Sequence, residues 1–159
     1  MKNIQVLESY SKLEQANLKG ISGSKLNYAI LCNKALLKTE AEALQASRVY
    51  APEFIKYDED VRKIFDKYAD KDANGDKITY GNQHKISNVE YLQKYNFEIL
   101  EFNKGKEELI AAAGIVDNEF LAHLEEESTI EIKTVSISLI PETITIEQLD
   151  ALMFMVTND

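Results

Sequence analysis

The chain is poor in the residues that most often carry out chemistry. It has one cysteine, two histidines, two arginines and six glycines. Because Cys32 is alone, no intrachain disulfide exists, and its helical context favours a small buried hydrophobic side chain over a reactive thiol. His84 and His123 have neither a histidine at helical spacing nor a cysteine pair, so the sequence predicts no metal site. We therefore expect a binding protein with no cofactor, and no enzyme.

Excess positive charge and long apolar runs are also missing. The 27 acidic and 18 basic residues give a net charge of −9, which repels nucleic acid and anionic lipid. No apolar run approaches the roughly 18 residues of a membrane span. Charged residues interrupt the apolar ones in residues 1–18, unlike a signal peptide. The sequence predicts a cytoplasmic protein with no membrane or nucleic-acid partner.

The spacing of apolar residues predicts a mainly helical α+β fold in a single domain, residues 1–159. Long amphipathic helices are expected at residues 4–19, from Ser24 as an N-cap through Leu44, and over 54–68, where Pro52 either starts a helix or kinks a longer one. Ser87 to Glu90 form a capping box for a fourth helix that stops near Gly105.

The rest of the chain shows turn dipeptides and a stretch in which apolar and polar residues alternate. Asn74-Gly75 predicts a turn, and Gly81-Asn82 predicts a small β-hairpin within residues 70–86. Gly114 is expected to end a short helix at 106–113, and Asp117 to cap another at 118–126. Alternation over 130–139 predicts a strand with a bulge near Lys133-Thr134. A capping box at Thr145 to Gln148 opens a last helix whose expected core face is Ile146, Leu149, Leu152, Met153 and Val156.

Two partial motifs resemble ligand sites. Residues 70–75, D-K-D-A-N-G, match the first half of a calcium loop, but Lys77 and Gly81 replace the apolar eighth and glutamate twelfth positions. We expect instead a polar turn in which Asp and Asn side chains bond to nearby backbone. Residues 22–25, S-G-S-K, lack the frame of a phosphate-binding loop and indicate the start of a helix.

The middle third of the chain is rich in aromatic residues, and this belt directs the site prediction. Tyrosine and arginine dominate many binding surfaces, and arginine beside an aromatic ring suits an anion or a nucleobase. The predicted ligand-binding residues lie near the hairpin and the Pro52 junction: Arg48, Tyr50, Tyr57, Arg62, Tyr80 and His84. The competing interpretation makes the tyrosines caps of the core and pairs the arginines with Glu53 or Asp58.

The order of elements and the segment Y-A-D-K-D-A-N-G at residues 68–75 resemble a broad group of small uncharacterised proteins of tailed phages and prophages. The resemblance covers roughly residues 20–156 and brings no catalytic residues. It implies a phage accessory protein in the host cytoplasm that neutralises a host factor, either a defence protein or a nucleotide immune signal.

Two other functions stay open at this point. A virion structural or assembly adaptor of the tail or head–tail region would use long helices and a strand edge for subunit contacts. An enzyme acting through His84 and an acidic neighbour is the third. We also expect a homo-oligomer, because the apolar faces of residues 26–44 and 54–68 and of the last helix are long for a monomer to cover.

Overall fold

The computed structural model describes residues 1–81 and 83–158, and its contacts group the chain into two compact units. Unit 1 combines Met1–Arg48 with Asn118–Asp159, and unit 2 is Val49–Asp117. More than half of the residues are helical, which confirms the mainly helical α+β prediction. The single domain stays a prediction.

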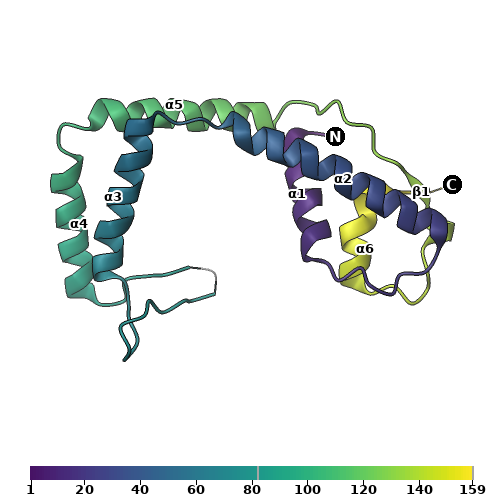
Figure 1. Cartoon of the computed structure of the whole chain (residues 1–159), viewed down its shortest axis with the longest axis horizontal. Coiled ribbons are helices and arrows are strands. Elements are labelled where there is room, and N and C mark those ends of the chain that lie inside the picture. Colours follow the sequence, from purple (N-terminus) through teal and green to yellow (C-terminus); the bar gives the residue numbers. More distant parts are fainter. Residues whose placement is uncertain (82, 159) are drawn as a thin grey trace. The chain divides into compact units, whose positions relative to one another are not determined.

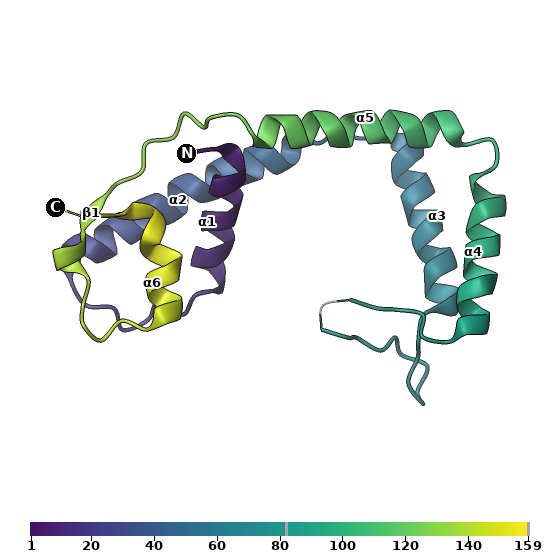
Figure 2. The same ribbon diagram turned by 180° about the vertical axis from the view of Figure 1, so that it is seen from behind.

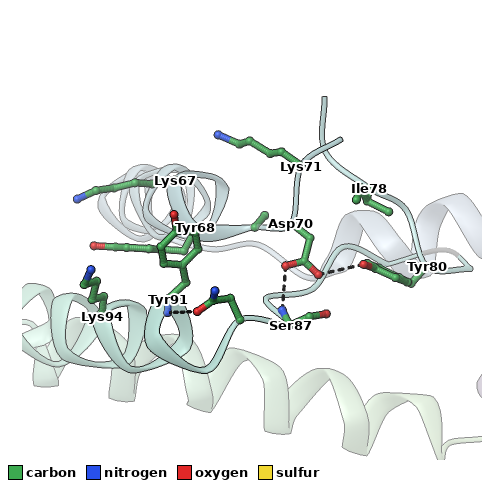
Figure 3. A pocket seen from close by; sticks show the side chains of 11 residues that line it. Lys67, Tyr68, Asp70, Lys71, Ile78, Tyr80, Ser87, Tyr91 and Lys94 are labelled. Carbon is green, nitrogen blue, oxygen red and sulfur yellow. Dashed lines mark hydrogen bonds between the residues drawn. The ribbon is translucent and has the colours of Figure 1, made fainter. Parts of the chain in front are cut away.

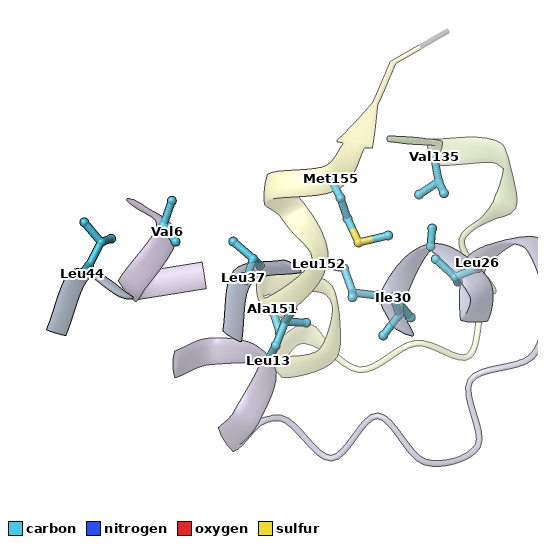
Figure 4. Close-up of a cluster of buried hydrophobic side chains, with 11 residues drawn as sticks. Val6, Leu13, Leu26, Ile30, Leu37, Leu44, Val135, Ala151, Leu152 and Met155 are labelled. Atoms are coloured by element: carbon cyan, nitrogen blue, oxygen red, sulfur yellow. The ribbon is translucent and has the colours of Figure 1, made fainter. Parts of the chain in front are cut away.

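Unit 1 is built around the helices α1 (Asn3–Gln15), α2 (Ser24–Ser47) and α6 (Ile146–Leu152), with α1 packed on both of the others (Figure 1). The expected apolar stripe of α2 forms most of its buried face. Figure 4 shows the resulting core, whose fully buried apolar side chains are Val6, Leu13, Leu26, Leu37, Leu152 and Met155. Each such side chain contributes about 1.5–3 kcal/mol on burial. This cluster covers the face of residues 26–44 on which the homo-oligomer prediction partly depended.

The start of α2 differs from the sequence prediction by one residue. Gly23 is the N-cap, with a φ of 114°, and Ser24 is the first helical residue rather than the cap. A positive φ strains any residue with a Cβ, so glycine fits this break better than serine. Cys32 is half-buried, not fully buried as expected. Its neighbour Asn33 is instead fully buried.

The predicted strand over residues 130–139 is largely absent. Only β1 (Val135–Ser136) is a strand, paired in parallel with β2 (Val156–Thr157), and Ile137–Leu139 form a 3₁₀ turn. The buried Asn33 side chain takes the place of a strand partner, because it accepts from the Lys133 amide and donates to the Lys133 carbonyl, both at 2.8 Å. The alternation of Ile130 and Ile132 reflects an extended chain with one side packed on the core.

The C-terminal capping box is confirmed, but the helix that follows it is shorter than predicted. Thr145 accepts from the Gln148 amide at 3.2 Å, and Gln148 accepts from the Thr145 amide at 3.0 Å. Helix α6 ends at Leu152, and a 3₁₀ turn, Met153–Met155, leads into β2. The predicted core face is therefore partly wrong: Ile146 is 87% exposed, and Met155 is buried in place of Met153.

Unit 2 contains two helices side by side, α3 (Pro52–Tyr68) and α4 (Val89–Asn103), as Figure 2 shows. Pro52 occupies the first turn of α3, so it starts a helix and does not kink one. Much of the aromatic belt lies between the two helices: Tyr57 stacks on Phe102 at 5.6 Å, and Phe65 meets Tyr95 edge-on at 5.8 Å. Neither helix contains a fully buried residue.

Helix α5 (Glu107–Leu124) is continuous, so the two short helices predicted around Gly114 are wrong. A glycine inside a helix costs about 1 kcal/mol relative to alanine. Three alanines precede Gly114, and Glu107 and Glu108 in the first turn complement the helix dipole. Asp117 lies within this helix, so it is not the N-cap of a separate helix.

The segment between α3 and α4 is held by turns and bridges. Asp72 accepts from the amides of Asn74 and Asp76 at 2.9 and 3.0 Å, which confirms the polar turn. Within the described residues of this segment, the hairpin consists of isolated bridges, such as Tyr80 with Gln83, and Asn82 lies outside them. The N-cap of α4 is Asn88, which accepts from the Tyr91 amide at 3.1 Å, and not Ser87. Within the described parts of the chain, no helix has both the length and the apolar character needed to cross a bilayer.

Candidate ligand-binding pocket

A pocket of ≈ 990 Å³ lies in unit 2, where α3 ends and α4 begins (Figure 3). The end of α3, the segment after it, the residue Tyr80 and the first turn of α4 form its wall. Three tyrosines and three lysines supply most of its chemistry: Tyr68, Tyr80, Tyr91, Lys67, Lys71 and Lys94. Its size matches that of small-molecule sites, which run to about 1,000 Å³.

Asp70 holds this wall together. Its Oδ1 accepts from the Ser87 amide at 2.9 Å and its Oδ2 accepts from the Tyr80 hydroxyl at 3.1 Å (Figure 3). The backbone of Asp70 bonds to the same segment: its amide donates to the Lys85 carbonyl, and its carbonyl accepts from the Ile78 amide. Hydrogen bonds from Ser87 are the main cause that lowers the pKa of the Asp70 carboxyl. The first residue of the apparent calcium loop thus acts as a clamp between the two helices.

A lysine lies over the ring of each pocket tyrosine. The Nζ of Lys67 lies 5.1 Å from the ring centre of Tyr68, and the Nζ of Lys94 lies 5.9 Å from that of Tyr91. The third tyrosine, Tyr80, has Lys85 at 3.7 Å. Such pairs place positive charge beside flat aromatic surface. A planar anion could stack on a ring and bond to an ammonium group in the same hollow.

The pocket lysines differ in their ion pairs. Lys67 donates to Glu98 at 2.7 Å and Lys94 donates to Glu90 at 2.6 Å, and these hydrogen bonds are the first causes that raise the pKa of each lysine. Both lysines are therefore charged at neutral pH. Lys71 makes no ion pair with any residue that the structure describes. The Lys71 ammonium group can therefore bind an anion without first breaking an ion pair with a carboxylate.

The structure brings one of the six predicted site residues, Tyr80, into this pocket. Nδ1 of His84 lies 3.0 Å from the Ile78 carbonyl oxygen, which ties it to the neighbouring backbone. Arg62 pairs with Asp58 at 2.7 Å, as the competing interpretation expects.

The other three predicted residues also have protein partners. Arg48, which belongs to unit 1, lies over the Phe120 ring at 5.4 Å. Tyr50 donates to Asp117, and Tyr57 donates to Asn103 at 2.8 Å. Burial is the first cause that raises the pKa of Tyr57. None of these three lines the pocket.

The sequence interpretation missed Tyr68, Tyr91 and the pocket lysines. A local signal existed: residues 67–94 hold five lysines and no arginine against four acidic residues, within a chain of net charge −9. This stretch is therefore weakly basic, at +1, although the whole chain is acidic.

The described part of the chain contains no cluster of three or more His, Cys, Asp or Glu side chains that could hold a metal ion. Comparison with protein-family models, with curated proteins and with solved structures finds no match to this chain.

Proposed function

We propose that this chain is a non-enzymatic binding protein that captures a small anionic aromatic ligand, of the nucleotide class, in the pocket of unit 2. The observation that carries the proposal is that each of the three pocket tyrosines has a lysine over its ring, and that two of these lysines, Lys67 and Lys94, also line the pocket. Stacking of a base on an aromatic side chain is worth about 1–3 kcal/mol. A charge-assisted hydrogen bond to phosphate adds about 1.5–3 kcal/mol.

The biological role that we propose is counter-defence by a phage protein in the host cytoplasm. The resemblance of residues 68–75 to phage proteins supports it, and the first four of these residues, Tyr68 to Lys71, form the start of the pocket wall. Sequestration of a nucleotide immune signal requires binding and no bond cleavage. An acidic surface gives no long-range attraction for an anion, so selectivity would depend on contacts inside the pocket.

The experiment is to identify a bound ligand and then to measure its affinity. Mass spectrometry of the supernatant after denaturation of the purified protein should reveal a co-purified nucleotide. Calorimetry with ATP, with a cyclic dinucleotide and with inorganic phosphate then separates recognition of the base from recognition of the phosphate. If none of these probes binds at millimolar concentration and no small molecule co-purifies, the nucleotide proposal is wrong.

Matched variants locate the site. Tyr91→Ala should weaken binding about 5- to 150-fold if the ring stacks on a base. Tyr28→Ala is the control, because Tyr28 of unit 1 is also exposed and also has a lysine, Lys133, over its ring at 5.6 Å. Lys71→Glu should likewise weaken binding, and Lys25→Glu on α2 should not. If the pocket and control variants lose affinity equally, the binding site is not in this pocket.

An assembly adaptor is the second candidate, and the exposed apolar row on α4 favours it. Phe97 and Leu100 are 67% and 63% exposed. A ring of fixed stoichiometry that contains no small molecule would support this function over ligand capture.

A further inference from the structure

The side of α4 that faces away from α3 carries a row of exposed apolar residues. Val89, Phe97 and Leu100 are 68%, 67% and 63% exposed, whereas Tyr95 and Phe102 on the opposite side meet rings of α3. Together with the exposed polar residue Gln93 they recur at intervals of four, four and three residues, which places them on one helix stripe. We call these four residues the α4 outer face. A hollow of ≈ 500 Å³ lies beside Phe97 and is lined mainly by residues of α4.

The chain exposes more surface than its mass requires. Two separate compact bodies sharing its mass would together expose about 9,700 Å², whereas the chain exposes 10993 Å². The difference of about 1,300 Å² is larger than the roughly 800 Å² that each partner contributes to a standard interface. Helices α3 and α4 of unit 2 contain no fully buried residue.

We propose that the α4 outer face binds the same face of a second copy of this chain, with the two α4 helices antiparallel about a two-fold axis at Phe97. Phe97 lies next to the midpoint of α4, so it would meet its own counterpart beside the hollow. Two-fold interfaces are self-complementary, and they are the commonest in soluble oligomers.

The charges on α4 fit this register. In an antiparallel pair centred on Phe97, Glu90 lies opposite the partner's Lys104, since both are seven residues from the centre. Within one chain, Glu90 pairs with Lys94 and Lys104 pairs with Glu101 across exposed surface. Exposed ion pairs are worth about 0–1 kcal/mol, so an exchange of partners costs little. The charges would set the register, and the two Phe97 side chains on the axis would supply the central apolar contact.

Molar mass tests the interface first. Light scattering at tens of micromolar should give about 36 kDa, twice the 18.1 kDa of one chain. Phe97→Asp should raise the dissociation constant of the dimer about 30- to 1,000-fold, as central interface residues do. Leu31→Asp is the matched control, because Leu31 on α2 is 68% exposed and should leave the dimer intact. A mass of about 18 kDa for the native chain, or a dimer insensitive to Phe97→Asp, overturns the proposal.

Cysteine cross-linking tests the register in a Cys32→Ser background. Phe97→Cys should form a disulfide dimer with diamide, because residues on the axis meet their own copies. Val89→Cys should not, since its two copies would lie about 24 Å apart along the antiparallel helices. A cross-link through position 89 but not 97 would refute the antiparallel arrangement. Circular dichroism of each variant, unchanged from the native spectrum, shows that the fold persists.

Discussion

Asn33 makes the sharpest test of how unit 1 is held together. Its side chain is fully buried and forms two 2.8 Å hydrogen bonds with the backbone of Lys133, a residue 100 positions later in the chain. Its Nδ2 also lies 3.4 Å from the sulfur of Met155. One amide side chain thus joins α2 to an extended segment that has no strand partner there.

Asn33→Ala removes both hydrogen bonds and leaves the Lys133 amide and carbonyl without their protein partner. Each lost hydrogen bond costs about 0.5–1.5 kcal/mol when water replaces it. The cost per bond rises to about 1–3 kcal/mol when the remaining group is buried and unsatisfied. Lys133 is an exposed residue, so water replaces part of these bonds and we expect a total loss of about 2–4 kcal/mol. For a chain of this length, that lowers the melting temperature by about 4–16 °C.

Urea unfolding followed by circular dichroism measures the loss, with Asn27→Ala as the control. Asn27 is also on α2, but it is exposed and makes one bond, to the Ile21 carbonyl at 3.2 Å. Its removal should cost about 0.5 kcal/mol or less. Hydrogen exchange adds a local readout, because the Lys133 amide should lose protection in Asn33→Ala. Equal stability of the two variants, with the Lys133 amide still protected, would refute the reasoning.

Two further predictions concern the core and the pocket. Leu37→Ala should destabilise unit 1 by about 2–5 kcal/mol in urea unfolding because Leu37 is fully buried, whereas Leu31→Ala on the exposed side of the same helix should cost about 0.5 kcal/mol or less. The folded-state pKa of Asp70 is lowered, so its carboxylate stabilises the fold fully above its ordinary value near 3.9, and that contribution is lost as pH falls through the lowered pKa. Asp70→Asn should therefore reduce stability at pH 7 and show a weaker loss between about pH 4 and pH 2 than the native chain. An identical acid dependence of the two proteins would show that the clamp at Ser87 and Tyr80 contributes nothing.

The helices of unit 1 were predictable because local chemistry and tertiary packing agree there. The stripe of α2 and the capping box at Thr145 combine a correct period with a correct cap. The prediction that Gly114 separates two short helices was wrong. A glycine inside a helix costs about 1 kcal/mol, and the strong helix formers on its N-terminal side outweigh that cost. Local signals cannot reveal such a balance.

The strand over residues 130–139 failed for a different reason. Alternation reports that one side of an extended chain is buried, and a sheet is only one way to bury it. Here Asn33 supplies the backbone bonds, and the sequence offers no sign that a residue 100 positions away would do so.

The pocket was only partly predictable. Tyr80 was identified through its turn, but Tyr68 and Tyr91 come together because Asp70 links the end of α3 to the start of α4. The sequence interpretation placed Asp70 in a polar turn with bonds to nearby backbone and so missed its contacts with Ser87 and Tyr80. Arginine drew attention because it often binds anions, yet the pocket uses lysine.

Unit 1 consists of two stretches of chain separated by all of unit 2, and this has a consequence for synthesis on the ribosome. The core side chains Val6, Leu13 and Leu37 pack in one cluster with Leu152 and Met155, which are translated more than 100 residues later. Residues 49–117 emerge completely while α1 and α2 still lack these partners. At about 5–20 residues per second, the apolar stripe of α2 stays uncovered for several seconds. During that interval the nascent chain is open to chaperones, and a truncation before α6 should leave α1 and α2 aggregation-prone.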